Sequence, residues 1–264
     1  MLPTDASEAR SGLCAIAVMA KAPRAGKVKT RLSPPLEPEE ARALSAAFLR
    51  DVTENLRLAA QEAPIQGFVA YAPAGMEALF DGMLAPGTQL VLADGAIPPE
   101  PGVEGFGLCL LHAVRSLLAQ GYGAACVLNS DSPTLPTGVL RDMAHLLVPG
   151  GAAPDAGDRA VLGPADDGGY YVLGMRHAHA GLFRDVAWST DRVADQTRAR
   201  AAELGLELAE LPAWFDVDDR AALQRLVDDR PEPSCPHLPY LAPATRAALD
   251  GMGAAARLRA EAAD

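Results

Sequence analysis

The side chains best suited to chemistry in this chain gather in one short segment that contains all of its lysines. Lys21, Lys27 and Lys29 lie within nine residues, whereas the other 20 cationic side chains are arginines. Arg24 and Arg31 bring the segment to five cations without an acid, in a chain with a formal net charge of −11. Cations concentrated in one loop of an acidic protein are most simply explained by a bound polyanion. We therefore expect phosphate groups to bind here; the alternative is a solvated basic turn.

Gly26 lies in the middle of this segment, where a residue without a side chain lets the backbone approach an anion closely. Arg31 can hold a phosphate through two hydrogen bonds, and Lys29 is also a candidate catalytic residue. The Walker A spacing GxxxxGK[ST] is absent from the segment. The predicted nucleotide phosphate-binding residues are Lys21, Gly26, Lys27, Lys29, Thr30 and Arg31.

Asp131 lies in a short turn after the apolar residues 124–128 and before a predicted helix. A carboxylate at the carboxyl end of a strand, opposite a phosphate loop, suits a magnesium ion. This makes Asp131 a candidate catalytic residue and metal ligand. The alternative is that Asp131 caps the following helix.

A second candidate metal ligand lies in the segment 214–219, which contains Asp216, Asp218 and Asp219. Asp216 and Asp218 point the same way if this segment is extended. We expect Asp218 to complete a Mg²⁺ site with Asp131, with Mn²⁺ as a possible substitute and Asp216 as the reserve ligand. The alternative is that Asp218 or Asp219 caps the next helix.

A third polar segment, 162–171, joins two predicted strands and contains two acids and two glycines. The glycines permit a ligand to approach the backbone. Asp166 or Asp167 could orient or deprotonate an acceptor, and Asp167 is the catalytic candidate. The predicted acceptor-binding residues here are Asp166, Asp167, Gly168, Gly169 and Tyr170. The alternative is a plain hairpin turn, for which Asp-Gly is a strong signal.

Apolar periodicity predicts the elements that position these residues. Strands are expected at 13–19, 67–71, 89–92, 124–128, 160–163, 171–175 and 206–211, and helices at 39–60, 75–84, 107–120, 136–148, 191–204 and 218–229. This alternation is typical of one α/β domain with a mainly parallel sheet and helices on both faces. We assign this domain to 13–230, a flexible extension to 1–12, and a Pro-rich and helical appendage to 231–264.

Composition excludes several classes of protein. An isoelectric point of about 4.9 argues against nucleic acid or an anionic membrane as the main partner. The four cysteines form no CxxC pair, which indicates reduced thiols, and no apolar run is long enough to span a bilayer. We expect a cytoplasmic protein, with a homodimer as an open possibility. The five histidines are scattered, and His177 with His179 is interpreted as a solvated loop pair.

Five motifs, taken in order, resemble one bacterial family. They are MAKAPRAGKVKTRL at 19–32, SDSPTLP at 130–136, GPADDGGYYVLG at 163–174, Trp188–Ser189–Thr190, and FDVDD at 215–219. The set is similar to the DUF2064 family, whose members are often labelled glycosyltransferases of the arsenosugar-biosynthesis type. That family belongs to the GT-A, or nucleotide-diphospho-sugar transferase, superfamily, which also holds guanylyltransferases. The resemblance runs from about residue 16 to about residue 226.

The resemblance implies a GT-A-like, Rossmann-like domain with nucleotide phosphates on the first loop and magnesium at Asp131 and Asp218. It adds Gly105 and Gly107 to the expected nucleotide-binding residues, and Ser189 and Thr190 to the acceptor-binding ones. The chain departs from the family pattern at Leu108 and Cys109, which replace a charged pair, and at Asn129, which replaces Gly. These positions would face the base, ribose or acceptor.

Two reactions and one non-catalytic role fit these observations. Nucleotidyl transfer from a nucleoside triphosphate to a small phospho- or sugar-like acceptor expels pyrophosphate, so it benefits from several fixed cations. Glycosyl transfer from a nucleotide-sugar leaves a diphosphate that a metal can largely hold. The cation cluster favours nucleotidyl transfer, whereas the family label favours glycosyl transfer. A nucleotide-binding regulatory module without turnover is the third alternative.

Overall fold

The computed structural model describes residues 10–148, 158–228 and 235–261. Its strands are β1 (Cys14–Lys21), β2 (Ile65–Ala72), β3 (Gln89–Leu92), β4 (Ala124–Asn129), β5 (Arg159–Pro164), β6 (Tyr170–Met175) and β7 (Glu207–Glu210). Its α-helices are α2 (Pro38–Ala59), α3 (Phe106–Ala119), α4 (Thr137–Leu147), α5 (Val193–Glu203), α6 (Arg220–Val227), α7 (Pro243–Gly251) and α8 (Ala254–Glu261). Short 3-10 turns are η1 (Thr30–Leu32), η2 (Glu77–Phe80) and η3 (Ala180–Phe183).

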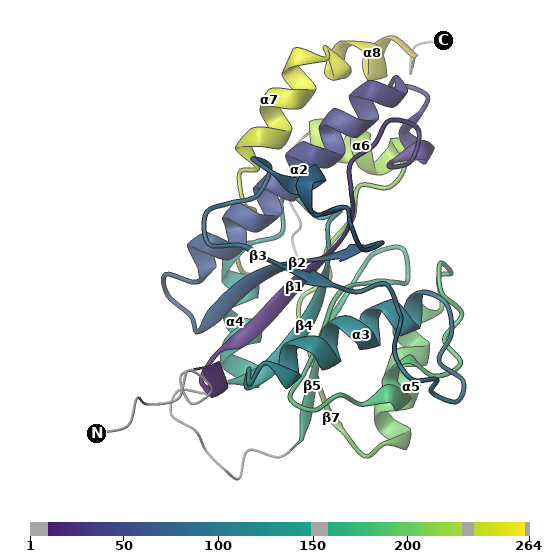
Figure 1. Cartoon of the computed structure of the whole chain (residues 1–264). Coiled ribbons are helices and arrows are strands. Elements are labelled where there is room, and N and C mark those ends of the chain that lie inside the picture. Colours follow the sequence, from purple (N-terminus) through teal and green to yellow (C-terminus); the bar gives the residue numbers. More distant parts are fainter. Residues whose placement is uncertain (1–9, 149–157, 229–234, 262–264) are drawn as a thin grey trace.

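The strands form one seven-stranded sheet in the order β3-β2-β1-β4-β6-β5-β7. The pairs β1–β2, β2–β3, β1–β4 and β5–β7 are parallel, whereas β6 runs antiparallel to both β4 and β5. The carboxyl ends of β1, β2, β4 and β5 therefore meet at one edge, together with the start of β6 (Figure 1). Ligands of open α/β sheets bind at such an edge.

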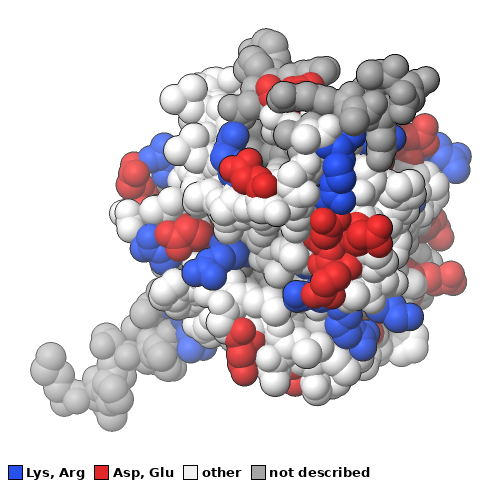
Figure 2. Space-filling view, turned by 90° about the horizontal axis from the view of Figure 1, so that it is seen from above, with Lys and Arg blue, Asp and Glu red and all other residues white. Residues whose placement is uncertain are grey.

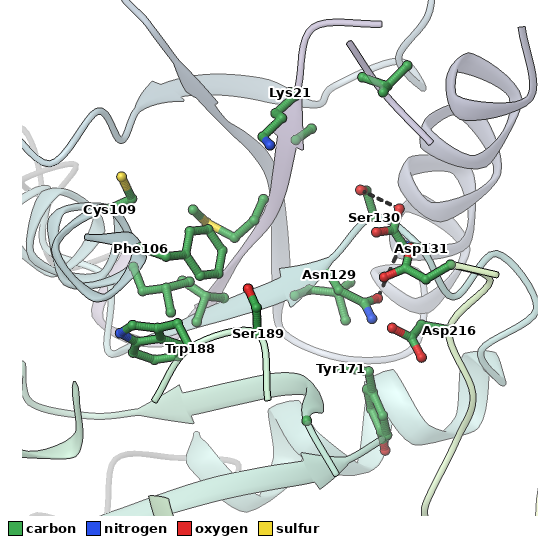
Figure 3. Close-up of a pocket in the computed structure, with 18 of the residues that line it drawn as sticks. Lys21, Phe106, Cys109, Asn129, Ser130, Asp131, Tyr171, Trp188, Ser189 and Asp216 are labelled. Carbon is green, nitrogen blue, oxygen red and sulfur yellow. Dashed lines mark hydrogen bonds between the residues drawn. The ribbon is translucent and has the colours of Figure 1, made fainter. Parts of the chain in front are cut away.

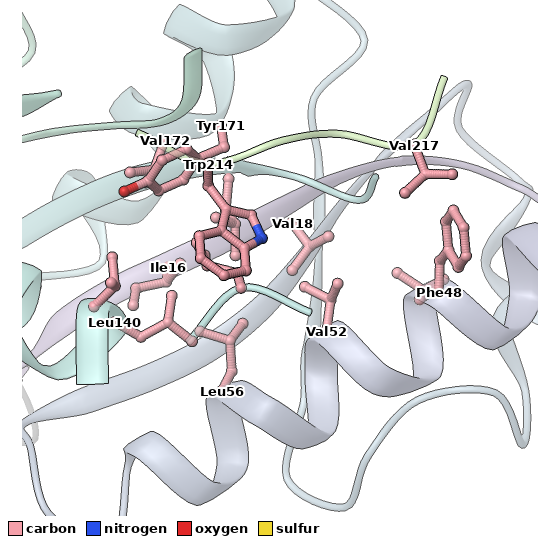
Figure 4. Close-up of a cluster of buried hydrophobic side chains, with 14 of the residues drawn as sticks. Ile16, Val18, Phe48, Val52, Leu56, Leu140, Tyr171, Val172, Trp214 and Val217 are labelled. Atoms are coloured by element: carbon pink, nitrogen blue, oxygen red, sulfur yellow. The ribbon is translucent and has the colours of Figure 1, made fainter. Parts of the chain in front are cut away.

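Each face of the sheet is covered by helices (Figure 1). On one face, alternate β1 residues such as Ile16 and Val18 share a core with residues of α2, α4, α6, α7 and α8. Figure 4 shows part of this core, with Phe48 and Val52 of α2 among its members. On the other face, Ala17 packs in a second core with α3, α5 and η3. The fold is a single α/β domain with a mainly parallel sheet, as the sequence predicted.

Helix α2 follows the cationic segment because its start is strongly specified. Pro38 occupies the first turn, and the side chains of Glu37 and Glu40 make a capping box with the backbone. Leu44, Phe48 and Val52 then recur at helical spacing and are buried. This helix is the support behind the segment that carries the lysines.

One predicted helix is wrong. Residues 75–84 form only the 3-10 turn η2, because Gly75 and Gly82 adopt positive φ angles of 84° and 71° on either side of it. No helix within the described ranges 10–148, 158–228 and 235–261 is both long and apolar enough to cross a membrane. On the face shown in Figure 2, basic and acidic side chains are interspersed among neutral ones.

The helices α7 and α8 are held against α2 by charged contacts. Asp51 is buried on α2 and accepts hydrogen bonds from the N–H groups of Ala244 at 3.1 Å and Thr245 at 2.6 Å. Asp51 thereby satisfies backbone N–H groups at the start of α7, where the N-cap residue Ala242 offers no side-chain oxygen. Most of the predicted extension 1–12 and the predicted boundary at residue 230 lie outside the described residues, so that division remains a prediction.

We expect Asp51→Ala to lower the free energy of unfolding by about 2 to 3 kcal/mol, because a buried N–H group of Thr245 and a partly buried one of Ala244 lose their acceptor. Urea unfolding measures this change. Arg50→Ala is the matched control, since Arg50 is exposed on the same helix and should change stability by less than about 0.5 kcal/mol. Equal stability of the two variants would show that α7 docks without this cap.

Candidate active site

A pocket of about 830 Å³ lies at the edge of the sheet where the parallel strands end (Figure 3). It is lined by the end of β1, the cationic segment, the turn after β4, the β5–β6 connection and the segments 188–191 and 216–218. Twelve predicted site residues line it: Lys21, Lys27, Lys29, Thr30, Arg31, Asp131, Asp167, Gly169, Tyr170, Ser189, Thr190 and Asp218. Residues from the ends of the domain sequence thus meet in one cavity.

Lys29 occupies the centre of the acidic part of the pocket. Its Nζ lies 2.8 Å from Oδ1 of Asp131, 2.8 Å from Oδ1 of Asp218 and 2.8 Å from the carbonyl oxygen of Val217. An ammonium group has three donors, so these three acceptors satisfy it. The side chain is only 5% exposed and lies 5.1 Å from the ring centre of Phe48. Lys29 therefore differs from the other cations of its segment.

The charge state of this group is set by burial and by the two carboxylates together. Burial disfavours the ammonium form, but Asp131 and then Asp218 outweigh it and raise the pKa of Lys29. Burial likewise opposes the charged form of Asp218, but Lys29 dominates and lowers the pKa of this carboxyl group. The Lys29 ammonium and the Asp218 carboxylate thus stabilise each other's charged form.

The backbone fixes the convergence of Asp131 and Asp218. The N–H of Val217 donates to the carbonyl oxygen of Asp131 at 2.8 Å, so the two turns are joined beside their carboxylates. Because both Oδ1 atoms contact one Nζ at 2.8 Å, they lie no more than twice that distance apart. The sequence-based expectation that these two turns meet agrees with this geometry.

Of the capping alternatives, only the one for Asp219 is confirmed. Asp219 is the N-cap of α6 and accepts a hydrogen bond from the N–H of Ala222 at 2.8 Å. Helix α4 begins after Pro136 without a side-chain cap, so Asp131 does not cap it. Asp131 instead accepts a hydrogen bond from Ser130 Oγ at 2.9 Å and faces Asp216 across the pocket (Figure 3).

Asp216 is the acid of this group whose ionised form is disfavoured. Burial, and then the negative charges of Asp167 and Asp218, raise the pKa of Asp216 to about 7. A carboxyl group with this pKa changes its charge near neutrality. Sequence reasoning named Asp216 only as a reserve metal ligand, because nothing in the sequence shows how many acids share the site.

Four predicted phosphate-binding residues are exposed at the pocket wall: Lys21, Lys27, Thr30 and Arg31. Gly26 adopts a φ angle of 68°, which a glycine accommodates readily, but it does not line the pocket. The cationic side chains of this wall are free to meet an anion from solvent, in contrast to Lys29. The wall thus presents positive charge next to the acidic centre.

Some residues in and beside the β5–β6 connection line the pocket, and others point away from it. Asp167 and Tyr170 line the pocket, and the buried Tyr170 hydroxyl makes no hydrogen bond to any residue that the structure describes. Asp166 turns away and pairs with Arg225 of α6 at 2.6 Å. Gly168 is structural, because a Cβ there would lie 2.1 Å from the carbonyl oxygen of Asp191. We therefore leave Asp166 and Gly168 out of the proposed acceptor contacts.

The far end of the pocket is aromatic. Trp188 contacts Phe106 and Tyr170 edge to face, with ring centres 5.8 Å and 6.5 Å apart. Phe106 is 51% exposed and lines the pocket. Gly107 lets α3 approach Trp188, because a Cβ there would lie 3.0 Å from the indole nitrogen. Gly105 and Gly107 do not line the pocket themselves, and their nucleotide contacts remain a prediction.

The predicted site residues left out several that line the pocket, including Phe106, Ser130, Trp188 and Asp191. Cys109 and Asn129 also line it, at positions that the family resemblance placed near the base, ribose or acceptor. Trp188 belonged to a recognised motif, and its aromatic type next to Ser189 and Thr190 was a usable signal. Burial and then Asp94 raise the pKa of the Cys109 thiol, which disfavours a nucleophilic role.

The fold and site define a class of protein. The chain has the fold of the nucleotide-diphospho-sugar transferase superfamily, with a cationic wall and an acidic centre at the carboxyl edge of the sheet. A solved structure from Desulfovibrio desulfuricans G20, provisionally described as a nucleotide-diphospho-sugar transferase, superposes with a TM-score of 0.72 at 25% identity, covering 93% of this chain and 96% of that one. The chain belongs to the DUF2064 family, described as an uncharacterized protein conserved in bacteria, which it matches over residues 55–190.

The family match contains Asp131 and the β5–β6 connection, whereas the cationic segment and Asp218 lie outside it. Two other solved structures overlap more loosely. They are a CMP:2-keto-3-deoxy-manno-octonic acid synthetase complexed with CTP (TM-score 0.48, 11% identity, 81% of this chain and 96% of that one) and a cytidylyltransferase from Leptospira borgpetersenii serovar Hardjo-bovis strain JB197 (TM-score 0.46, 8% identity, 92% and 95%). No curated protein matches the sequence.

We expect Lys29→Met to destabilise the protein because it leaves two carboxylates facing each other without a cation. The loss should be about 2 kcal/mol, less than for a fully buried ion pair, since Asp131 is 29% and Asp218 is 44% exposed. Added Mg²⁺ should recover part of the loss. Thermal unfolding with and without Mg²⁺ measures both effects. Lys27→Met is the control, and a Lys29→Met protein as stable as this control would refute the role of Lys29.

The raised pKa of Asp216 predicts a pH dependence of stability. The pKa of Asp216 is about 7 in the folded protein, above its ordinary value of 3.8. Ionisation of this carboxyl group therefore destabilises the folded protein, and this destabilisation is absent at low pH. The destabilisation develops as pH rises from about 4 and is complete above about 7. In EDTA, Asp216→Asn should therefore unfold at a higher temperature than the parent at pH 8 and at nearly the same temperature at pH 4. A difference that does not grow with pH would contradict this.

Proposed function

We propose that the protein is a magnesium-dependent nucleotidyltransferase that uses a nucleoside triphosphate and a small phospho- or sugar-like acceptor. Its membership of the nucleotide-using transferase superfamily makes it an enzyme of the transferase class. One observation carries the narrower proposal. Three exposed cations, Lys21, Lys27 and Arg31, line the same pocket as the acidic centre, so a triphosphate can meet both at once.

The acidic centre suits a divalent metal in the type and closeness of its donors. Asp131 and Asp218 offer carboxylate oxygens, which Mg²⁺ prefers, from two turns that the backbone holds together. These two residues would hold the ion, and Asp216 is the neighbouring reserve. When bound, the ion supplies charge neutralisation between phosphate oxygens. Lys29 now lies between the same carboxylates, and we propose that it is the cation that gives way.

The remaining side chains would bind and orient the two substrates. Lys21, Lys27 and Arg31 would stabilise the pyrophosphate end of the triphosphate as negative charge develops there. The acceptor oxygen would attack the α-phosphorus and break its bond to pyrophosphate. Asp167 lines the pocket near Asp216 and would take the acceptor proton. The Tyr170 hydroxyl, which has no hydrogen-bond partner among the described residues, would bind a polar group of the acceptor.

A second reaction, glycosyl transfer from a nucleotide-sugar, is favoured by one comparison. The Desulfovibrio protein, which covers 93% of this chain at 25% identity, is described with that substrate class. In this reaction the anomeric carbon is attacked and a nucleoside diphosphate leaves, so the acidic centre would have the same role. The number of exposed cations favours the triphosphate, and the non-catalytic alternative predicts binding without either release.

Pyrophosphate release separates these functions. We expect release from at least one nucleoside triphosphate in the presence of Mg²⁺ and a panel of phosphorylated acceptors. Nucleoside diphosphate release from nucleotide-sugars under the same conditions would instead support glycosyl transfer, and no release from either set would support a binding module.

Adjacent aspartates provide a matched pair for the metal site. We expect Asp218→Asn to reduce turnover by more than about 100-fold, because the amide is a poor magnesium ligand. Asp219→Asn keeps the N-cap of α6, since Asn and Asp cap equally well, and should retain turnover. Steady-state kinetics at several Mg²⁺ concentrations measures both. Equal turnover in the two variants would rule out Asp218 as a ligand.

The cationic wall provides another matched set. We expect Lys27→Ala and Arg31→Ala each to weaken triphosphate binding by about 1.5 to 3 kcal/mol, because each removes a charge-assisted contact. Binding of the corresponding nucleoside should change far less. Arg24→Ala is the control, since Arg24 is an exposed cation of the same segment that does not line the pocket. Isothermal titration measures these affinities, and identical losses in all three variants would indicate a general charge effect.

A further inference from the structure

A second group of metal-binding side chains lies away from the pocket, at the open end of the β5–β6 hairpin. Asp158 immediately precedes β5, and His177 and His179 follow β6. One ligand atom from each of the three side chains lies within 4.8 Å of the others. The sequence suggested that the two histidines form a solvated loop pair, but both of their rings face the carboxylate of Asp158.

The backbone explains this convergence. In the antiparallel ladder Ala160 pairs with Met175, so Asp158 and His177 are the opposite residues two positions further along. The N–H of His179 then donates to the carbonyl oxygen of His177 at 2.9 Å. This tight turn brings the second ring beside the first, with their centres 6.2 Å apart. The three side chains are therefore positioned by the end of a regular hairpin.

Each carboxylate oxygen of Asp158 faces a different ring. Nδ1 of His177 lies 3.0 Å from Oδ1, and Nε2 of His179 lies 2.7 Å from Oδ2. Nε2 of His179 is inaccessible to solvent and, despite this short distance, makes no well-oriented hydrogen bond to any part of the chain that the structure describes. His179 therefore directs a buried ring nitrogen at the carboxylate, and the described chain does not satisfy its hydrogen-bonding capacity.

The donor set selects a kind of metal. Two imidazole nitrogens and one carboxylate oxygen suit zinc and the neighbouring first-row ions, whereas Mg²⁺ prefers oxygen ligands throughout. Zinc bonds of about 2.0 to 2.2 Å place tetrahedral ligand atoms roughly 3.3 to 3.6 Å apart. The separations of 3.0 Å and 2.7 Å at Asp158 must expand by roughly 0.3 to 0.9 Å to reach this range, which side-chain rotation can supply. Three protein ligands leave a fourth position for water.

We propose that Asp158, His177 and His179 bind a divalent transition metal, with Zn²⁺ as the best-fitting ion. The site joins the start of β5 to the chain leading into η3, whose Leu182 and Phe183 are buried in the core beneath α3 and α5. The opposite end of the same hairpin carries Asp167 and Tyr170 in the pocket. A bound ion would hold this hairpin in place from the side remote from the substrates.

Zinc titration of the whole chain tests the proposal. In excess Mg²⁺, which occupies sites made only of carboxylates, we expect one Zn²⁺ to bind per chain and to raise the unfolding temperature. His177→Ala, His179→Ala and Asp158→Asn should each weaken binding by more than about tenfold, because each removes one ligand. His145→Ala removes an exposed histidine outside the cluster and should bind zinc as the parent does.

Two further readouts exclude indirect effects. In EDTA, His177→Ala and Asp158→Asn should unfold at the parent temperature, since these two side chains are exposed, and should lose only the increase caused by zinc. Substitution with Co²⁺ should give the visible absorption of a four-coordinate ion in the parent and in His145→Ala. The proposal is overturned if the parent binds no zinc under these conditions, or if the double variant His177→Ala/His179→Ala keeps the zinc-dependent increase.

Discussion

The buried ammonium of Lys29 is the interaction on which the site depends. Its three acceptors come from Asp131, Val217 and Asp218, which are more than 100 residues away in the sequence. The segment after β1, the turn after β4 and the chain leading into α6 are thereby joined at one point. Without a cation there, Asp131, Asp216 and Asp218 would repel one another in a partly buried space. Lys29 allows these acids to be assembled before any ligand arrives.

The cations of one short segment thus have two different roles. Lys21, Lys27 and Arg31 are exposed and face the pocket, whereas Lys29 is turned inward with its backbone in the left-handed region at φ 49°. The exposed cations can bind an anion without disturbing the fold, but a metal ion at Asp131 and Asp218 must compete with Lys29. Substrate and metal binding would therefore be coupled to a rearrangement of the first loop.

Sequence reasoning predicted the parts of this arrangement that follow from local patterns. Apolar runs followed by polar turns marked β1 and β4, and the carboxyl edge of a parallel sheet then required Lys29 and Asp131 to be neighbours. The antiparallel direction of β6 was raised only through the alternative of a hairpin turn at Asp-Gly, because both faces of that strand are buried and its alternation carries no sign of direction. The inward turn of Lys29 was not predicted, since five cations in one loop look equivalent until their backbone angles are known.

The most direct test of the central claim is a crystal structure with Mn²⁺ and a non-hydrolysable triphosphate analogue, in which anomalous scattering locates the ion. The account predicts Mn²⁺ bonded directly to Asp131 and Asp218, Lys29 displaced from between them, and the triphosphate on Lys27 and Arg31. An ion bound elsewhere, with the Lys29 ammonium still between the two carboxylates, would contradict it.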